Sequence, residues 1–202
     1  SDSPPANFPL HARGHPQNPM SLSQIARVSH QKGYEFARDM EDRRYLRRDH
    51  EGFHPLQVRE LLEEWVREDA FSPAPRISVR RIFPGPPGLA LPLDNILLST
   101  SKARIAVGGF EASSRLGLIH ASYSHPEVHI EGPIEAILHD LDVEICEPRD
   151  ADFNIIRSPH SESVFRGAQV RDRVPIVDAL QAALDVAGNP ARGLEQAEYI
   201  VE

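Results

Sequence analysis

The chain has a single cysteine, Cys146, among its 202 residues. One thiol cannot form a disulfide within the chain, and it cannot build a zinc site from cysteines alone. The sequence also lacks an apolar run of the roughly 18 residues that a membrane-spanning helix requires, and its start has no apolar signal core. These absences favour a cytoplasmic protein, and we expect no membrane partner.

Lysine is almost absent as well. Lys32 and Lys102 are the only two lysines, and arginine supplies the rest of the 22 basic residues, which stand against 30 acidic ones. The formal net charge of −8 excludes a general polyanion binder, because such proteins hold their ligand through a large positive surplus. Any nucleic-acid site is therefore expected to be local.

Signatures of two hydrolase classes are missing. A restriction-type nuclease needs Glu-x-Lys next to a further acid, and neither lysine has a glutamate two positions before it. No Gly-x-Ser-x-Gly turn marks a serine hydrolase. Both classes of enzyme are thereby excluded.

A nucleotidyltransferase-like enzyme stays open as an alternative. Gly108-Gly109 precedes a predicted helix, and Asp140 and Asp142 offer two carboxylates on one strand face for two metal ions. The spacing argues against this class, because Asp140 lies 31 positions after Gly109 and at the predicted end of a helix. Glycines that let a helix start close to a sheet explain the motif equally well. We expect no enzyme activity and no cofactor.

A metal site is a further alternative. His125, Glu127, His129 and Glu131 would share one face of a strand, and imidazole and carboxylate groups suit zinc. The same alternation is typical of the polar face of a half-buried strand, and we adopt this interpretation, which needs no metal.

Residues 1–19 contain five prolines and no apolar period, which predicts an extended arm. The pattern changes at Met20. Ser21 is placed to cap a short helix, and Gly33 is predicted to break the chain after it.

A second helix is predicted over Tyr34–Tyr45, and residues 47–54 surround a glycine turn that is typical of a small hairpin. Helix, turn, helix and hairpin in this order are typical of a winged helix-turn-helix, in which the hairpin is the wing. Pro55 is predicted to open a third helix with an acidic outer face, which closes this first module at residues 20–72.

Residues 76–202 alternate between strand and helix patterns, which predicts a mixed α/β (α+β) domain. The predicted strands are 77–83, 104–107, 127–130, 142–146 and 153–157. The predicted helices are 111–116, 133–141 and 194–201, one through Leu93 and Leu97 after a rigid turn at 84–88, and one that carries Ile176 and Leu180. The apolar stretch 83–91 is interpreted as a tight connection rather than a protein-contact edge.

A recognition helix presents side chains to base edges at its N-terminal end and is surrounded by cations that hold phosphates. Six basic residues stand against four acidic ones between His30 and Arg48, a local surplus of +2. The predicted DNA-binding residues are Gln31, Lys32, Tyr34, Arg38, Arg43, Arg44, Arg47 and Arg48. The alternative is a module that binds only protein, whose arginines form a solvated face.

Five segments carry a family resemblance: "MSLSQIARVSHQKGYEFARDMEDRRYLRRDHEGF" from Met20, "LLEEW" ending at Trp65, "VGGFEASSRLGL" from Val107, "VPIVDALQAALDVAG" from Val174 and "ARGLEQAE" from Ala191. In their order and spacing they resemble the AbiE-type antitoxins, which are transcriptional regulators of type IV toxin-antitoxin (abortive infection) systems. The resemblance covers nearly the whole chain and includes no catalytic signature.

The resemblance implies an N-terminal winged helix that represses its own operon by binding double-stranded operator DNA, and a C-terminal domain that acts in neutralising a nucleotidyltransferase-type toxin. By position, Lys32, Tyr34 and Arg38 fall on the recognition helix, and Arg47 and Arg48 fall on the wing. A complete winged helix has a further helix before Ser21. We therefore expect DNA affinity to depend on a homodimer or on residues upstream of Ser1.

Overall fold

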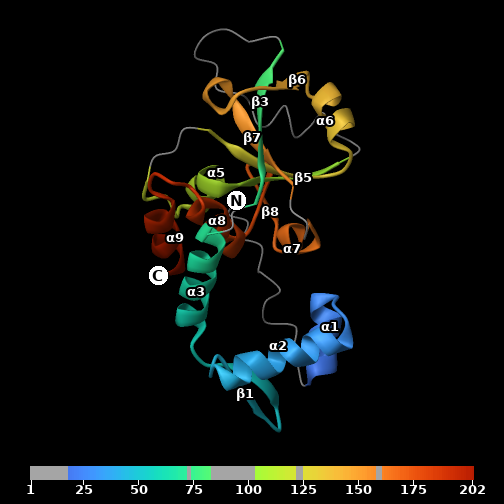
Figure 1. Cartoon of the computed structure of the whole chain (residues 1–202), viewed down its shortest axis with the longest axis vertical. Helices are drawn as coiled ribbons and strands as arrows, with labels where there is room; N and C mark the ends of the chain where they lie inside the picture. Colours follow the sequence, from blue (N-terminus) through green and yellow to red (C-terminus); the bar gives the residue numbers. More distant parts are fainter. Residues whose placement is uncertain (1–17, 72–73, 83–102, 122–124, 158–160) are drawn as a thin grey trace, which may run out of the picture. The chain divides into compact units, whose positions relative to one another are not determined.

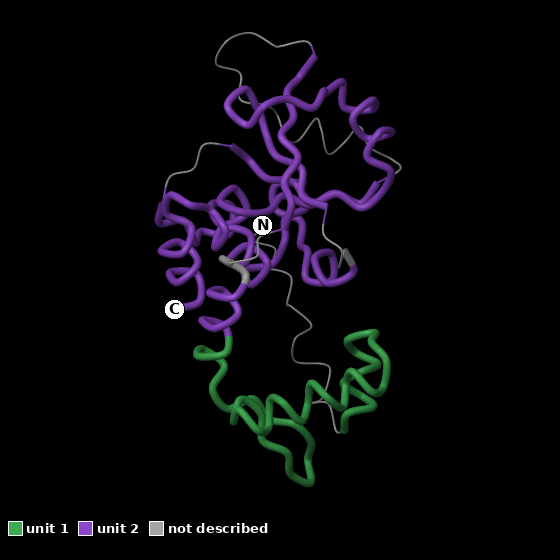
Figure 2. Tube along the Cα trace, viewed as in Figure 1, with its two compact units in different colours: residues 1–61 green, residues 62–202 purple. Residues whose placement is uncertain are grey.

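The computed structural model describes residues 18–71, 74–82, 103–121, 125–157 and 161–202. The chain forms two compact units, residues 1–61 (unit 1) and residues 62–202 (unit 2), which Figure 2 colours separately. Most of the predicted arm, as well as the turn and the helix expected between 84 and 97, lies outside the described residues.

Unit 1 contains helices α1 (Pro19–Ala26) and α2 (His30–Asp42) and a hairpin of strands β1 (Leu46–Asp49) and β2 (Gly52–Pro55) (Figure 1). The prediction that Ser21 caps α1 is wrong. Asn18 is the cap: its side chain accepts a hydrogen bond from the Ser21 N–H, and the Ser21 hydroxyl oxygen accepts one from the Asn18 N–H. This reciprocal pair satisfies two donors at the start of the helix.

Gly33 lies inside α2, and the prediction that it breaks the chain is wrong. The helix begins at His30 because the Ser29 hydroxyl caps it and accepts from the Lys32 N–H at 3.2 Å. A Cβ at position 33 would lie 2.6 Å from the Ser23 Cβ and 2.9 Å from the Pro19 carbonyl oxygen. Gly33 therefore lets α1 pack directly on the backbone of α2.

The third helix, α3 (Val58–Phe71), begins later than predicted. Pro55 is the last residue of β2 and pairs with Leu46, and the Leu56 N–H then donates to the Tyr45 carbonyl at 2.9 Å. These contacts keep the chain in the hairpin for one more residue, so that Pro55 ends a strand instead of opening a helix.

Unit 2 is a mixed α/β fold around a seven-stranded sheet in the order β6-β3-β7-β5-β4-β9-β8. The β5–β7 and β4–β9 pairs are parallel, and the other four pairs are antiparallel. The strands are β3 (Arg76–Arg81), β4 (Arg104–Gly108), β5 (Glu127–Glu131), β6 (Val143–Ile145), β7 (Phe153–Ile156), β8 (Gln169–Arg171) and β9 (Val174–Ile176).

The helices of unit 2, besides the larger part of α3, are α5 (Gly109–Leu116), α6 (Ile134–Asp140), the short 3-10 helix η2 (Pro148–Asp150), α7 (Ser161–Arg166), α8 (Ala179–Ala187) and α9 (Gly193–Val201). In Figure 1, α5, α8 and α9 gather on one side of this unit, and α6 and α7 lie on the other. Two clusters of buried apolar residues hold these elements, one around Phe153 and Ile155 of the sheet and one around Phe110, Ala183 and Val186 of the helices. Among the described helices, none combines the length and the apolar character needed to cross a membrane.

The five strands predicted between 77 and 157 and the helices predicted at 111–116, 133–141 and 194–201 are confirmed, with small shifts of their ends. The helix expected to carry Ile176 begins only at Ala179, and Ile176 belongs to β9. The β8–β9 hairpin was missed because its turn, Asp172-Arg173, contains no glycine. Both turn residues adopt left-handed conformations, with φ of 48° and 67°, which usually call for glycine or asparagine.

We expect Gly33→Ala to destabilise unit 1 by about 1–2 kcal/mol, because the overlap with Ser23 and the Pro19 carbonyl outweighs the better helix propensity of alanine. Amide hydrogen exchange of α1 and α2 measures this loss. Lys32→Ala, at the exposed neighbouring position, should change exchange little. Slower exchange in Gly33→Ala than in the unchanged protein would contradict the close helix contact.

Candidate nucleic-acid interface and a buried charged cluster

Helix α2 presents one apolar side to the interior of unit 1. Gly33, Ala37 and Met40 are its buried residues. Since successive residues of an α-helix are rotated by about 100°, the side opposite to them carries Gln31, Glu35, Arg38 and Asp42. We call these four residues the outer stripe, and all four are exposed.

Two pairs connect the members of the outer stripe. Gln31 Nε2 donates a hydrogen bond to Glu35 Oε1 at 2.8 Å, and Arg38 Nε lies 3.8 Å from Asp42 Oδ2. Both pairs join residues four positions apart, as helix geometry favours. Lys32 and Tyr34 flank the first pair on its two sides, and the Tyr34 side chain is 54% exposed.

The end of α2 and the hairpin carry the remaining predicted cations. Arg43 lies over the Tyr45 ring, 5.0 Å from its centroid, and 3.5 Å from the Asp39 carboxylate. Arg48 lies over the Phe53 ring at 5.6 Å, opposite to it in the hairpin. Contacts with aromatic faces restrain these long side chains without neutralising their charge.

Arg47 is held beside Asp49 in the hairpin, 3.5 Å from its Oδ2. Asp49 Oδ1 accepts from the Glu51 N–H at 2.9 Å and lies 3.0 Å from His54 Nε2. The backbone hydrogen bond from Glu51 is the main cause that lowers the pKa of Asp49, and His54 and Arg47 act in the same direction. The turn of the hairpin is thus organised around an ionised carboxylate.

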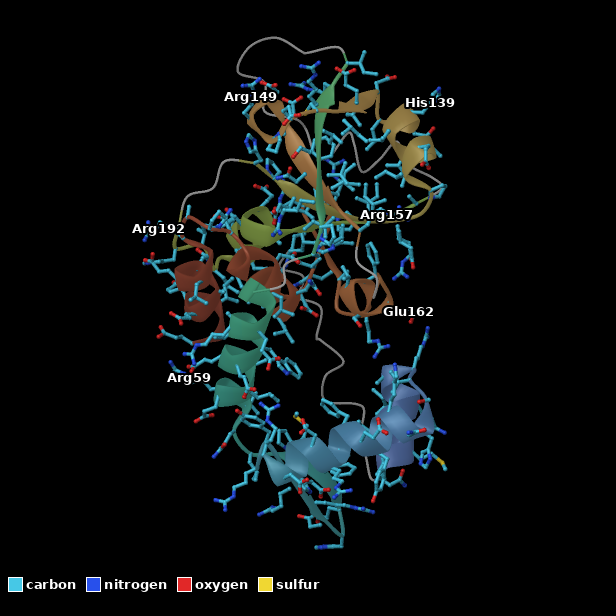
Figure 3. All side chains as sticks on the ribbon, viewed as in Figure 1. Arg59, His139, Arg149, Arg157, Glu162 and Arg192 are labelled. Atoms are coloured by element: carbon cyan, nitrogen blue, oxygen red, sulfur yellow. The ribbon has the colours of Figure 1, made fainter. Side chains whose placement is uncertain are left out.

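All eight residues that the sequence singled out for DNA binding are exposed, and all lie on α2, on the hairpin or between them. Side chains project outward from these elements in Figure 3. Residues 1–61 contain 9 basic and 8 acidic residues, whereas residues 62–202 contain 13 basic and 22 acidic ones. Unit 1 is therefore nearly balanced in charge, whereas unit 2 carries the surplus of acidic residues.

Unit 2 contains a second group of polar residues, which is buried. Glu127 and His129 project from one face of β5. The expectation that this strand is half-buried is wrong, because residues 127–130 are all buried and α8 covers the face that carries these two side chains. His129 Nε2 lies 2.8 Å from Asp185 Oδ2 on α8, and the two side chains are only 2% and 4% exposed. Polar atoms buried to this depth are normally hydrogen-bonded.

Asp185 has three donors around its carboxylate. Oδ2 accepts from the Gly109 N–H at 3.0 Å and from His129, and Oδ1 accepts from Gln181 Nε2 at 2.8 Å. Because Asp185 Oδ2 also accepts from the Gly109 N–H, His129 Nε2 is the donor in this contact. Its Nδ1 is buried and has no hydrogen-bond partner in the part of the chain that the structure describes.

Arg76 joins this group to the start of β3. Its Nε donates to Glu127 Oε1 at 2.5 Å, and another guanidinium nitrogen donates to the Asp185 carbonyl oxygen at 2.7 Å. Burial raises the pKa of Glu127, and the adjacent Arg76 opposes this shift. Arg76, Glu127, His129, Gln181 and Asp185 form what we call the buried cluster.

The two consecutive glycines after β4 make room for the buried cluster. A Cβ at Gly108 would overlap Asp185 Oδ2 and lie 2.8 Å from His129 Cδ2. A Cβ at Gly109, whose φ is 58°, would overlap Glu127 Oε2. The glycines serve close packing of carboxylates and imidazole at the start of α5.

This arrangement offers little support for nucleotide chemistry at the glycines. The Gly109 N–H, the first donor of α5, is already occupied by the Asp185 carboxylate. Asp140 is the last residue of α6 and Asp142 lies in the following turn with a φ of 51°, so the prediction that they share a strand face is wrong. Neither aspartate reaches β6, which begins at Val143.

The four residues considered for zinc are not brought together. Glu127 and His129 enter the buried cluster, whereas Glu131 lies 3.0 Å from Arg104. Among the residues that the structure describes, no group of three or more His, Cys, Asp or Glu side chains is arranged to hold a metal ion. The hydrogen bonds and the ion pair of the buried cluster hold β3, β5, α5 and α8 together.

Arg76, Gln181 and Asp185 were not predicted from the sequence. A signal did exist for Asp185, because it is the only charged residue in the helix sequence ALQAALDVA, in which Gln181 is the only other polar residue. No family model, no curated protein and no solved structure matches this chain.

Replacing Arg76 by methionine should lower the free energy of unfolding of unit 2 by about 3 kcal/mol, because Glu127 would be left buried without its cation. Urea denaturation measures the loss. Arg80→Met is the matched control on the same strand: it removes the exposed pair with Glu144 and should cost about 1 kcal/mol or less. Equal losses in the two variants would contradict a special role for the buried cluster.

The raised pKa of Glu127 predicts a pH dependence of stability. The folded protein takes up this proton at a higher pH than the unfolded chain, so Glu127 costs stability while it is ionised in the fold. As the pH falls from 7 toward the ordinary glutamate range, the unchanged protein should gain stability relative to Glu127→Gln. Unfolding measured across this range tests the sign, and Glu144→Gln serves as the exposed control. A relative loss of stability on acidification would overturn the assignment.

Proposed function

We propose that unit 1 is a winged helix-turn-helix that binds double-stranded DNA, and that the protein is a transcriptional regulator. In this proposal α2 is the recognition helix and the β1–β2 hairpin is the wing. The observation that carries the proposal is the set of eight exposed donor and cation side chains on α2 and the hairpin. The elements α1, α2 and the β1–β2 hairpin follow one another in the order of the helix-turn-helix and wing of DNA-binding winged helices.

The division of charge supports a site confined to unit 1. DNA binding requires cations close to phosphates, and the surplus of acidic residues in unit 2 would repel a duplex. Arg47, Arg48 and Lys32 are the residues proposed to hold phosphates, because their side chains are exposed. Gln31 and Tyr34 lie in the N-terminal half of α2, from which recognition helices reach base edges, and Arg38 follows just past the middle of the helix.

The wider role rests on the family resemblance. We propose that the DNA is the operator of the protein's own operon, that the protein is the antitoxin of a type IV toxin-antitoxin system, and that it works in the cytoplasm with a cognate toxin. A gene for a nucleotidyltransferase-like protein directly beside this one would support the assignment.

A second candidate is a winged-helix module that binds protein. Three apolar side chains of α1, α2 and the turn between them favour it: Met20, Val28 and Phe36 are 54%, 43% and 39% exposed. Methionine and aromatic side chains such as these are enriched at protein-contact surfaces. A pull-down in which the protein retains a partner after nuclease treatment, together with an absence of DNA binding, would favour this candidate.

The DNA-binding proposal predicts that Arg47→Ala weakens binding to a duplex DNA fragment that contains the promoter of the protein's own operon, and that this effect depends on salt. Loss of one phosphate contact should reduce the slope of log K against log salt concentration by about 1. Fluorescence anisotropy over a series of salt concentrations measures the slope. Arg149→Ala is the control, because Arg149 is exposed on η2 of unit 2 (Figure 3).

The proposal fails if the unchanged protein shows no salt-dependent binding to this fragment. It also fails if the Arg38→Ala, Arg47→Ala and Arg48→Ala variants all bind like the unchanged protein.

A further inference from the structure

The hydrogen bond between Gln31 and Glu35 gives the outer stripe of α2 a fixed acceptor. One hydrogen of the Gln31 amide is committed to Glu35 Oε1 at 2.8 Å. The Glu35 carboxylate makes no other hydrogen bond or ion pair within the part of the chain that the structure describes. Its second oxygen is therefore available to accept a hydrogen bond from a ligand.

Glu35 differs from Asp39 and Asp42 of the same helix in its partner. Asp39 and Asp42 each lie beside an arginine, Arg43 and Arg38 respectively, which compensates their charge. Glu35 is bonded to a neutral amide and keeps its full negative charge on the side of the helix opposite to the interior. On a surface that approaches phosphates this charge is unfavourable, unless it meets a donor in the groove.

The major groove offers few donors to a carboxylate. Guanine presents two acceptors, thymine presents an acceptor and a methyl group, and adenine presents its amino group beside the N7 acceptor. Cytosine presents its N4 amino group without an adjacent acceptor. A carboxylate therefore fits the cytosine edge and is repelled by the acceptor edges of the other bases.

Resting on the proposed DNA-binding function, we propose that Glu35 is a specificity-determining residue that accepts a hydrogen bond from cytosine N4, and that Gln31 positions it. Glu35 lowers the affinity for DNA in general, because it repels phosphates, and restores affinity only where a cytosine meets it. Selectivity thus arises as much from rejection of wrong sequences as from attraction to the right one.

The test compares the base preference of variants in a selection from randomised duplex DNA, followed by anisotropy on single-site duplexes. The unchanged protein should prefer cytosine at one position by about tenfold. Glu35→Gln should lose most of this preference and bind random-sequence DNA more tightly. Gln31→Ala should weaken the preference without tightening random-sequence binding, because the carboxylate keeps its charge but loses its orientation.

Glu41→Gln is the matched control. It removes the same charge from α2, but Glu41 is rotated by about a third of a turn from Glu35. This variant should leave the cytosine preference intact.

Three results separate the inference from the function on which it rests. A Glu35→Gln protein that is folded, binds DNA and keeps the cytosine preference overturns the inference and leaves DNA binding standing. Loss of the preference in Glu41→Gln to the same extent also overturns it. Failure of the unchanged protein to bind any duplex overturns the proposed function itself.

Discussion

Unit 2 depends most on the hydrogen bonds of Asp185. Its carboxylate accepts from the backbone N–H of Gly109 and from the side chains of His129 and Gln181, and its backbone carbonyl oxygen accepts from Arg76. These groups come from four different elements and span the sequence from position 76 to position 181. A buried carboxylate is tolerated only when donors surround it, so the fold of unit 2 has to bring all of these elements together at once.

The two units use polar groups in opposite ways. In unit 2 the decisive polar atoms are buried and bonded to one another, and their role is to hold the sheet, α5 and α8 in place. In unit 1 the cations of α2 and the hairpin are exposed, and the interior consists of small or apolar residues such as Ala37, Met40 and Phe53. Surface charge there contributes little to stability and is available for a ligand.

Much of the fold followed from local patterns. Apolar period two and period 3.6 located the strands between 77 and 157 and most helices, because each of these elements buries one face or both. The errors occurred where a cap or a turn used unexpected residues. Asn18 and Ser29 start helices that were expected to start at Ser21 and Tyr34, and the Asp172-Arg173 turn has left-handed residues without a glycine.

The candidate interface and the buried cluster differ in how far sequence reveals them. Residues of α2 are close in sequence, so their common exposure follows from helix geometry alone. The buried cluster joins Arg76 to Glu127 and Asp185 through the sheet order β3-β7-β5, which no local pattern contains. Alternation did place Glu127 and His129 on one face, but it could not identify α8 as the element that covers that face.

The close approach at Gly108 also constrains how this chain can diverge. The Asp185 carboxylate and the His129 ring fill the space beside Gly108, so that no side chain larger than the hydrogen atom of glycine fits there. A lineage that shortened both side chains would release position 108 for alanine or serine, and such a residue would in turn prevent the carboxylate and the imidazole from returning. The three positions are therefore expected to vary as a set among descendants of this sequence, with order-dependent, effectively irreversible steps.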